Sequence, residues 1–175
     1  MTKWPRRFAA LALGAVLAVM VACSAADDSA GPTPPSELQV GGALLSLGDL
    51  HLLACSAQPY AVRTQTVGTA GGTIVVGTHR LVIPAGALAK PVQIKAEQLT
   101  GKVNSVRFSP EGLKFAKPAT LSLSYSNCSP LLLLKRVVYT NELLGILELL
   151  PSIDDLRSRT VSAPIRHFSR YAVAW

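Results

Sequence analysis

The stretch TLSLSY, residues 120–125, alternates apolar with hydroxyl-bearing side chains and has the clearest period of two in the chain. Successive side chains of a strand point to opposite faces of a sheet. The alternation therefore predicts a strand with one buried and one solvated face, and it indicates that a sheet covers the core.

Segments of similar length lie on both sides of this strand, and glycine or proline separates many of them. They are residues 73–76, 79–83, 92–97, 106–108, 136–140, 160–163 and 168–175. Short strands with such turns favour an antiparallel sandwich or barrel. We expect an all-β fold, an antiparallel β-sandwich of about 8–10 short strands.

Residues 141–150, NELLGILELL, allow two interpretations. Good helix formers and a capping residue, Asn141, favour a helix. The neighbouring strands and the short length favour a hairpin with its turn near Leu144 and Gly145. Both alternatives remain open from the sequence.

The amino terminus has the pattern of an export signal. Lys3, Arg6 and Arg7 precede an uncharged apolar run, Phe8 to Ala22, that is too short to span a bilayer as a helix. The run ends in MVAC, residues 20–23, which resembles a bacterial lipobox. That resemblance implies cleavage before Cys23 and attachment of a lipid to it. The alternative is an ordinary signal peptide in which the cysteine is incidental.

These features divide the chain into four parts. We expect a lipoprotein signal peptide at 1–22, a flexible tether rich in Ser, Pro and Asp at 23–37, a Leu-rich connecting segment at 38–64 and the β-sandwich at 65–175. Within the connecting segment, residues 38–54 are expected to form a short amphipathic helix that docks on the sandwich. A contact with the membrane surface is the alternative.

Composition limits the class of protein. With 49% apolar and 15% charged residues, the chain is too hydrophobic for a disordered tail. Removal of residues 1–22 takes away Lys3, Arg6 and Arg7 and lowers the formal charge from +7 to +4. The remaining cations are scattered, so we do not expect nucleic-acid binding.

Cys55 and Cys128 are the two cysteines left if Cys23 carries a lipid. Exported proteins fold in oxidising compartments, so we expect a disulfide that closes a loop of about 70 residues. Metal ligation is the competing interpretation, but the three histidines are isolated from one another in the sequence. We therefore expect neither a metal site nor a cofactor.

Three groups of motifs carry a resemblance to a known family. They are GGTI with LVIPAGAL at 71–74 and 81–88, VRFSPEGLKF with KPATL at 106–115 and 117–121, and HFSRYAV at 167–173. Together they resemble the ZU-five domain, named for zonula occludens and Unc-five receptor proteins, and especially its short bacterial secreted versions. The resemblance covers residues 65–175. It implies a β-sandwich used in adhesion, cytoskeletal anchoring or signalling, mostly without catalytic activity.

The tripeptide His167-Phe168-Ser169 is the one candidate catalytic feature. In some ZU-five relatives an HFS tripeptide is a self-cleavage site. By that resemblance Ser169 Oγ attacks the Phe168 carbonyl in an N-to-O acyl shift, His167 removes the hydroxyl proton, and water hydrolyses the ester. The reaction needs a kinked backbone and a donor for the oxyanion. In the alternative, His167 bonds a neighbouring loop, Phe168 lies in the core and Ser169 lies on a strand.

We therefore expect a lipid-anchored module of the bacterial cell envelope, facing the periplasm or the surface. A binding or structural role is expected, because the chain lacks phosphate-loop, calcium-loop and nucleophile-elbow patterns. The expected partners are the membrane, through Cys23, and an envelope or extracellular protein or a polysaccharide. Self-processing at the Phe168–Ser169 bond is the alternative function.

Overall fold

The computed structural model describes residues 39–40, 43–44, 47–129 and 131–175. The chain divides into residues Met1–Ser36 and Glu37–Trp175, and everything described belongs to the second part. The predicted signal peptide, the predicted lipid site at Cys23 and the predicted tether lie outside the described residues.

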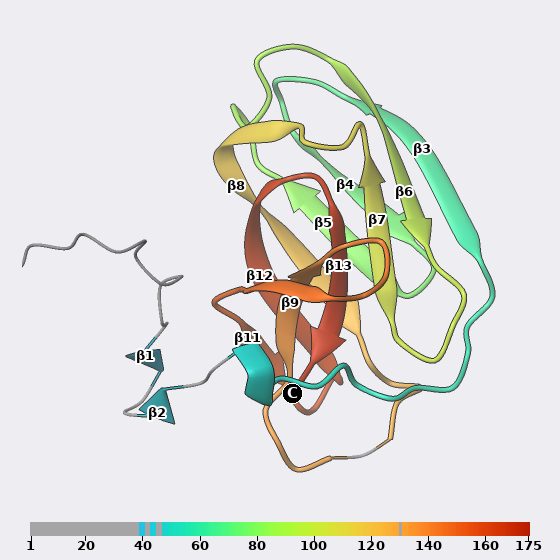
Figure 1. Cartoon of the computed structure of the whole chain (residues 1–175). Helices are drawn as coiled ribbons and strands as arrows, with labels where there is room; N and C mark the ends of the chain where they lie inside the picture. Colours follow the sequence, from blue (N-terminus) through green and yellow to red (C-terminus); the bar gives the residue numbers. More distant parts are fainter. Residues whose placement is uncertain (1–38, 41–42, 45–46, 130) are drawn as a thin grey trace, which may run out of the picture. The chain divides into compact units, whose positions relative to one another are not determined.

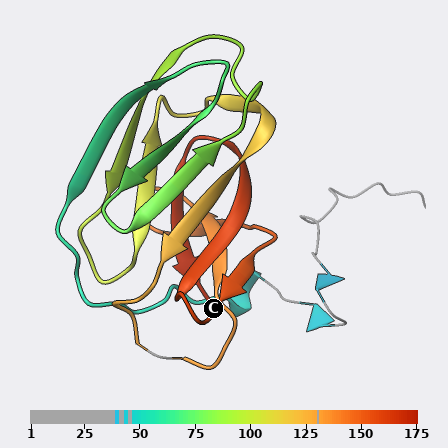
Figure 2. The same cartoon turned by 180° about the vertical axis from the view of Figure 1, so that it is seen from behind.

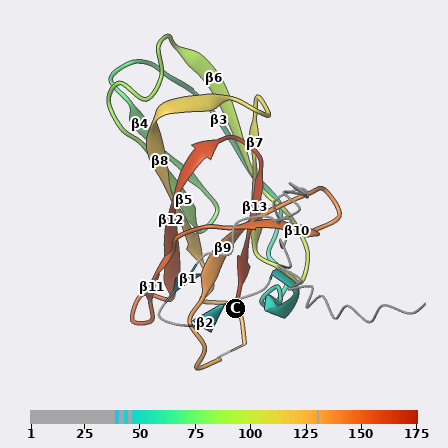
Figure 3. The same cartoon turned by 60° about the vertical axis from the view of Figure 1, so that its left-hand side comes forward.

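Two antiparallel sheets form the body of this part, and their packing confirms the expected all-β sandwich (Figures 1 and 2). The six-stranded sheet contains, in order, β10 (Ile146–Leu149), β9 (Arg136–Thr140), β13 (Arg170–Ala174), β7 (Ser105–Ser109), β6 (Val92–Gln98) and β3 (Ala61–Val67). The five-stranded sheet contains β11 (Ile153–Asp155), β12 (Thr160–His167), β8 (Lys114–Ser124), β5 (His79–Ile83) and β4 (Gly72–Val76). Figure 3 shows the sandwich from its edge, with the five-stranded sheet on the left.

Three short elements precede the sandwich strands among the described residues. Strands β1 (Gln39–Val40) and β2 (Ala43–Leu44) pair with each other, and η1 (Leu47–Asp49) is a single 3-10 turn. The two large sheets hold eleven strands, slightly more than the eight to ten expected. The three-residue strand β11 is one that the sequence pattern did not indicate.

The alternation that predicted β8 is reproduced in its burial. Leu121, Leu123 and Tyr125 are buried, while Ser122 and Ser124 between them are half-buried. The buried side chains meet those of the opposite sheet in one core cluster, in which Leu121 and Ile94 are fully buried. One face of each sheet therefore forms the core of the sandwich.

Residues 141–150 form the hairpin and not the helix. Strands β9 and β10 pair antiparallel, and the turn between them contains Leu144 with a φ of 64°. The Asn141 side chain, expected as a helix cap, instead accepts hydrogen bonds from Leu143 N (3.0 Å) and Gly145 N (2.8 Å). Pairing with β9 outweighs the helix propensity of the segment.

The helix expected within residues 38–54 is not formed in the described part of that segment, and this prediction was wrong. Only η1 is helical there. Backbone pairing replaces the helix, because Leu53 N donates to Val173 O (2.9 Å) and His51 exchanges two hydrogen bonds with Trp175. Leu53 is fully buried, so this stretch of the connecting segment contributes to the core. The predicted boundary at residue 65 stays a prediction, and strand β3 already begins at Ala61.

Candidate functional site

The HFS tripeptide forms the corner between β12 and β13. Strand β12 ends at His167 and β13 begins at Arg170. Phe168 is fully buried, stacks on Phe108 at 5.2 Å between ring centres and meets Phe115 edge-on at 5.0 Å. The corner is therefore anchored by an aromatic side chain in the core.

The peptide bond between Phe168 and Ser169 is held by backbone hydrogen bonds. Phe168 N donates to Leu113 O (2.8 Å), and Gly112 N donates to Phe168 O (2.9 Å). Phe108 N donates to Ser169 O (3.1 Å). The Gly112 N–H thus lies where an oxyanion would form if Phe168 were attacked, which is one of the two requirements for cleavage.

The His167 ring lies beside the same carbonyl. Its Nδ1 is 3.5 Å from Phe168 O, and the ring packs against Tyr139 and Tyr171. Tyr171 OH donates to His167 O (2.7 Å). In the described part of the chain no hydrogen bond joins His167 to Ser169 Oγ, so the predicted base and nucleophile are neighbours without being connected.

Backbone strain, the second requirement, is found elsewhere. Among the described residues, the two non-glycine residues with positive φ are Leu144 and Arg159, and neither belongs to the HFS corner. Ser169 is buried and lies in the corner just before β13. The structure therefore supplies the oxyanion donor but does not show the strained backbone.

The predicted disulfide is confirmed. Cys55 and Cys128 are bonded, with an S–S distance of 2.05 Å. The bond joins the segment before β3 to the turn after β8, and Ser56 N donates to Asn127 O (2.9 Å) beside it. This link fixes part of the connecting segment to the sandwich.

A buried carboxylate, Glu97, was not singled out by the sequence, where it reads as an exposed strand residue alternating with Ile94 and Ala96. Tyr60 OH donates to Glu97 at 2.5 Å, and Lys95 Nζ lies 2.8 Å from it. Arg107 Nε, 3.3 Å away, completes the set.

The three groups that donate hydrogen bonds to Glu97 keep its carboxyl group ionised. Burial by itself would raise the pKa of the Glu97 carboxyl, but hydrogen bonds from Lys95, Tyr60 and Arg107 outweigh burial and lower the pKa to about 2. A carboxylate so fully paired is a poor proton acceptor at neutral pH. The Glu97 cluster is therefore a structural ion-pair network on the outer face of the six-stranded sheet.

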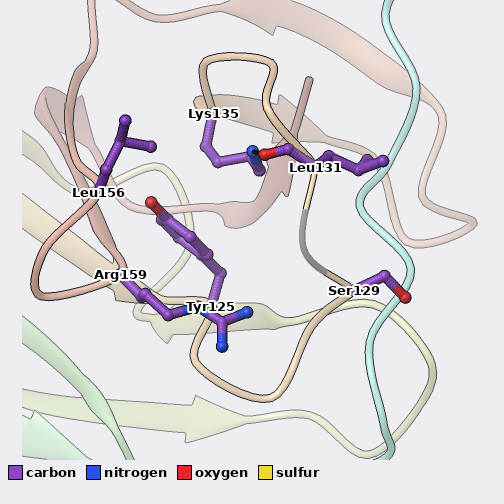
Figure 4. Close-up of a pocket in the computed structure, with 6 residues that line it drawn as sticks. All are labelled: Tyr125, Ser129, Leu131, Lys135, Leu156 and Arg159. Atoms are coloured by element: carbon purple, nitrogen blue, oxygen red, sulfur yellow. Dashed lines mark hydrogen bonds between the residues drawn. The ribbon is translucent and has the colours of Figure 1, made fainter.

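A small pocket lies between the turn after β8 and the turn that joins β11 to β12 (Figure 4). It has a volume of about 150 Å³ and is lined by Tyr125, Ser129, Leu131, Lys135, Leu156 and Arg159. Pockets for drug-sized ligands are roughly 300–1,000 Å³, so this one accepts only a small group. The sequence did not predict it, because its walls come from two segments, residues 125–135 and 156–159, that are apart in the sequence.

The described residues contain no group of three or more His, Cys, Asp or Glu side chains arranged for a metal ion. No helix in this part of the chain is long and apolar enough to span a membrane. Comparison with protein-family models and with curated proteins finds no match to the chain.

Proposed function

We propose that this chain is a lipid-anchored module of a bacterial cell envelope, with a ZU-five-like β-sandwich that has a binding or structural role. The observation that carries the proposal is the Cys55–Cys128 disulfide. Disulfides persist in exported proteins. Of the three cysteines, the bond leaves Cys23 for another use, and Cys23 follows directly on the apolar run of an export signal.

Contacts between the motif blocks support the ZU-five part of the proposal. Ala116 N, between the VRFSPEGLKF and KPATL motifs, donates to Ala87 O of the LVIPAGAL motif (3.0 Å). Leu113 O of the VRFSPEGLKF motif accepts a hydrogen bond from Phe168 N of the HFSRYAV motif (2.8 Å). Motifs far apart in the sequence thus meet in the folded chain, as motifs that define one domain are expected to do.

Replacement of the proposed lipid site tests the anchor. After an alkaline carbonate wash, which removes proteins held only by surface contacts, we expect the unchanged protein in the membrane fraction of the bacterial cell and Cys23→Ala out of it, because a lipid chain needs the thiol. Ser24→Ala, the neighbouring control, should remain in the membrane fraction. A Cys23→Ala protein that stays membrane-bound like the control would contradict the anchor.

The sandwich itself is proposed to contact an envelope or extracellular protein or a polysaccharide. Cross-linking of the anchored chain in intact cells, followed by identification of the product, tests this role. A cross-linked product that requires the folded sandwich is the expected result. Recovery of uncross-linked chain alone, with an efficient cross-linker, would contradict it.

Self-processing is the second candidate function, and the hydrogen bond from Gly112 N to Phe168 O favours it. In this reaction Ser169 Oγ bonds to the Phe168 carbonyl carbon while the Phe168–Ser169 C–N bond breaks. The hydroxyl proton passes through His167 to the released amine. Water then cleaves the ester, which leaves a carboxylate on Phe168 and restores the Ser169 hydroxyl.

Intact-mass measurement decides whether this reaction occurs. After incubation at neutral pH and denaturation, the unchanged protein should lose residues 169–175. Ser169→Ala should keep its full mass, whereas Ser169→Cys, which retains a nucleophile, should still be cleaved. A full mass for the unchanged protein after prolonged incubation would exclude self-processing.

A further inference from the structure

The loop between β8 and β9 exposes four consecutive leucines, Leu131 to Leu134, which we call the leucine loop. Leu132 is fully exposed, and the exposed fractions of Leu133 and Leu134 are 52% and 55%. Runs of exposed apolar residues are unfavourable in water and commonly mark an interaction site. The exposed side chains of the leucine loop therefore indicate a contact with an apolar surface.

One apolar side chain from the turn between β11 and β12 belongs to the same region. Leu156 follows β11 and lines one wall of the pocket whose other wall includes Leu131, as Figure 4 shows. Leu156 is 57% exposed. Exposed apolar side chains therefore come from two segments that meet at this pocket.

A buried lysine holds the leucine loop in shape. Lys135 is 1% exposed, and its Nζ donates to Leu131 O (2.8 Å) and to Leu133 O. Its backbone N donates to Asp154 Oδ2 (2.8 Å), and Asp154 Oδ1 accepts from Tyr125 OH (2.6 Å). The loop backbone is thus fixed from inside while its side chains point outward.

The hydrogen bonds from Lys135 to the leucine loop reduce the cost of placing that loop next to lipid. In a bilayer no water is available to backbone carbonyls, so each must find its partner within the protein. The carbonyls of Leu131 and Leu133 already have one in Lys135. These two bonds cover part of the loop backbone, so insertion would place the leucine side chains in the acyl layer and leave the rest of the loop backbone at the hydrated headgroup level.

Cationic groups lie next to the apolar side chains. Arg157 is exposed in the turn after β11. Arg159 lines the pocket, half-buried, and one of its guanidinium nitrogens donates to Cys128 O (2.6 Å), which leaves its other N–H groups for a phosphate. The turn also carries an exposed carboxylate, Asp155, whose ionised form is stabilised by a hydrogen bond from Ser158 Oγ (2.7 Å), so the two arginines leave the turn with a net positive charge. Leucines bordered by arginines complement a bilayer surface with anionic headgroups.

We propose that the leucine loop inserts its side chains into the acyl layer of a bilayer with anionic headgroups, with Arg157 and Arg159 at the level of the phosphates. This contact lies far along the chain from Cys23 and does not depend on the lipid proposed there. It would hold the sandwich against the membrane in a fixed orientation.

Tryptophan quenching in vesicles tests the insertion. The full chain is reconstituted into vesicles of equal parts phosphatidylcholine and phosphatidylglycerol, with or without bromine on the acyl chains. Leu132→Trp reports on the leucine loop, and Leu143→Trp is the matched control, because Leu143 is 92% exposed in a different turn. The unchanged chain gives the background from Trp175, together with that from Trp4 where residues 1–22 are retained.

We expect a blue shift and loss of the added fluorescence for Leu132→Trp with brominated lipid, and neither for Leu143→Trp. Equal quenching at both positions, or none at residue 132, would overturn insertion. A blue shift at residue 132 that appears without vesicles and grows with protein concentration would assign the loop to a second copy of the chain, and so would also overturn it. Leu133→Trp repeats the test should Leu132→Trp fold poorly.

Headgroup charge is tested separately. In vesicles of phosphatidylcholine alone, quenching at residue 132 should decrease, and Arg157→Gln should decrease it in the mixed vesicles. Quenching that is insensitive to both changes would contradict the role of the arginines. Neither result depends on Cys23, because the readout is local to the loop.

Discussion

His79 is a buried neutral histidine in the five-stranded sheet. It is 1% exposed, its Nδ1 accepts a hydrogen bond from Ser124 N (3.2 Å), and its Nε2 has no hydrogen-bond partner among the described residues. Burial lowers the pKa of the imidazole from 6.5 to about 4. The folded chain therefore resists a proton that the unfolded chain accepts.

This difference predicts how stability depends on pH. Between pH 6.5 and 4 the unfolded state binds a proton at His79 while the folded state does not, so the free energy of unfolding falls as the pH falls. The contribution of His79 to this loss should be roughly 2–3 kcal/mol and should level off below pH 4, whereas the paired Glu97 carboxylate, with its pKa of about 2, adds a separate loss below pH 4.5. Urea unfolding at pH 7 and pH 4.5 should show this loss in the unchanged protein and a smaller loss in His79→Gln. The same loss in both proteins would show that other groups cause it.

Gly71 and Gly112 share a backbone conformation but not an environment. Their φ angles are 75° and 73°, in the left-handed region. A Cβ at Gly71 would overlap the Ile83 carbonyl oxygen and approach Pro84 C to 2.7 Å, while one at Gly112 would meet nothing within 4 Å. Of these two positions, only Gly71 needs a residue without a side chain, because another backbone segment, at Ile83 and Pro84, lies against it.

The pair makes a matched comparison. Gly112→Ala should lower the free energy of unfolding by about 1 kcal/mol, the cost of the left-handed conformation. Gly71→Ala should lower it by more than about 2 kcal/mol, or prevent folding, because backbone must also move. Urea midpoints measure both. Equal losses would contradict the close contact at Gly71.

Local alternation predicted the strands well wherever one face is buried and the other solvated. Strand β8 is the clearest case, and in β6 the predicted alternation places Ile94 and Ala96 in the core with Gln93 and Lys95 exposed. The pattern could not place β3, since its residues 62–64 are all exposed and give no alternation. It also left residues 141–150 open, because pairing with β9 is a long-range property that helix propensity does not contain.

The candidate site was predicted to different degrees. The disulfide followed from counting cysteines, and the HFS tripeptide was located by its motif. The contact of Gly112 with Phe168 could not be predicted, because it joins the PEGL turn to a corner far along the chain. The leucine loop was missed because a run of leucines usually indicates core, and only the fold shows these exposed.

The disulfide links the segment before β3 to the turn after β8, across a sequence separation of 73 residues. Removing both sulfurs in Cys55→Ala with Cys128→Ala should destabilise the protein by roughly 4 kcal/mol in the chain-entropy model. Urea unfolding of this variant should match that of the unchanged protein in reductant. An unchanged midpoint in both cases would contradict a stabilising role.

The whole molecule combines a disulfide-linked sandwich with two proposed membrane contacts: a lipid on Cys23 behind the predicted export signal, and an apolar loop that enters the bilayer. The formal charge of +4 expected after processing adds a general attraction to anionic membranes. A protein with two membrane contacts would present the rest of its sandwich to a partner in a defined orientation.

The most direct test of the lipid anchor is the intact mass of the protein extracted from the membranes of producing cells. The account predicts a chain that begins at Cys23 and carries the mass of a lipid on that residue. A membrane-extracted chain that begins at another residue, or one that begins at Cys23 without added mass, would contradict it.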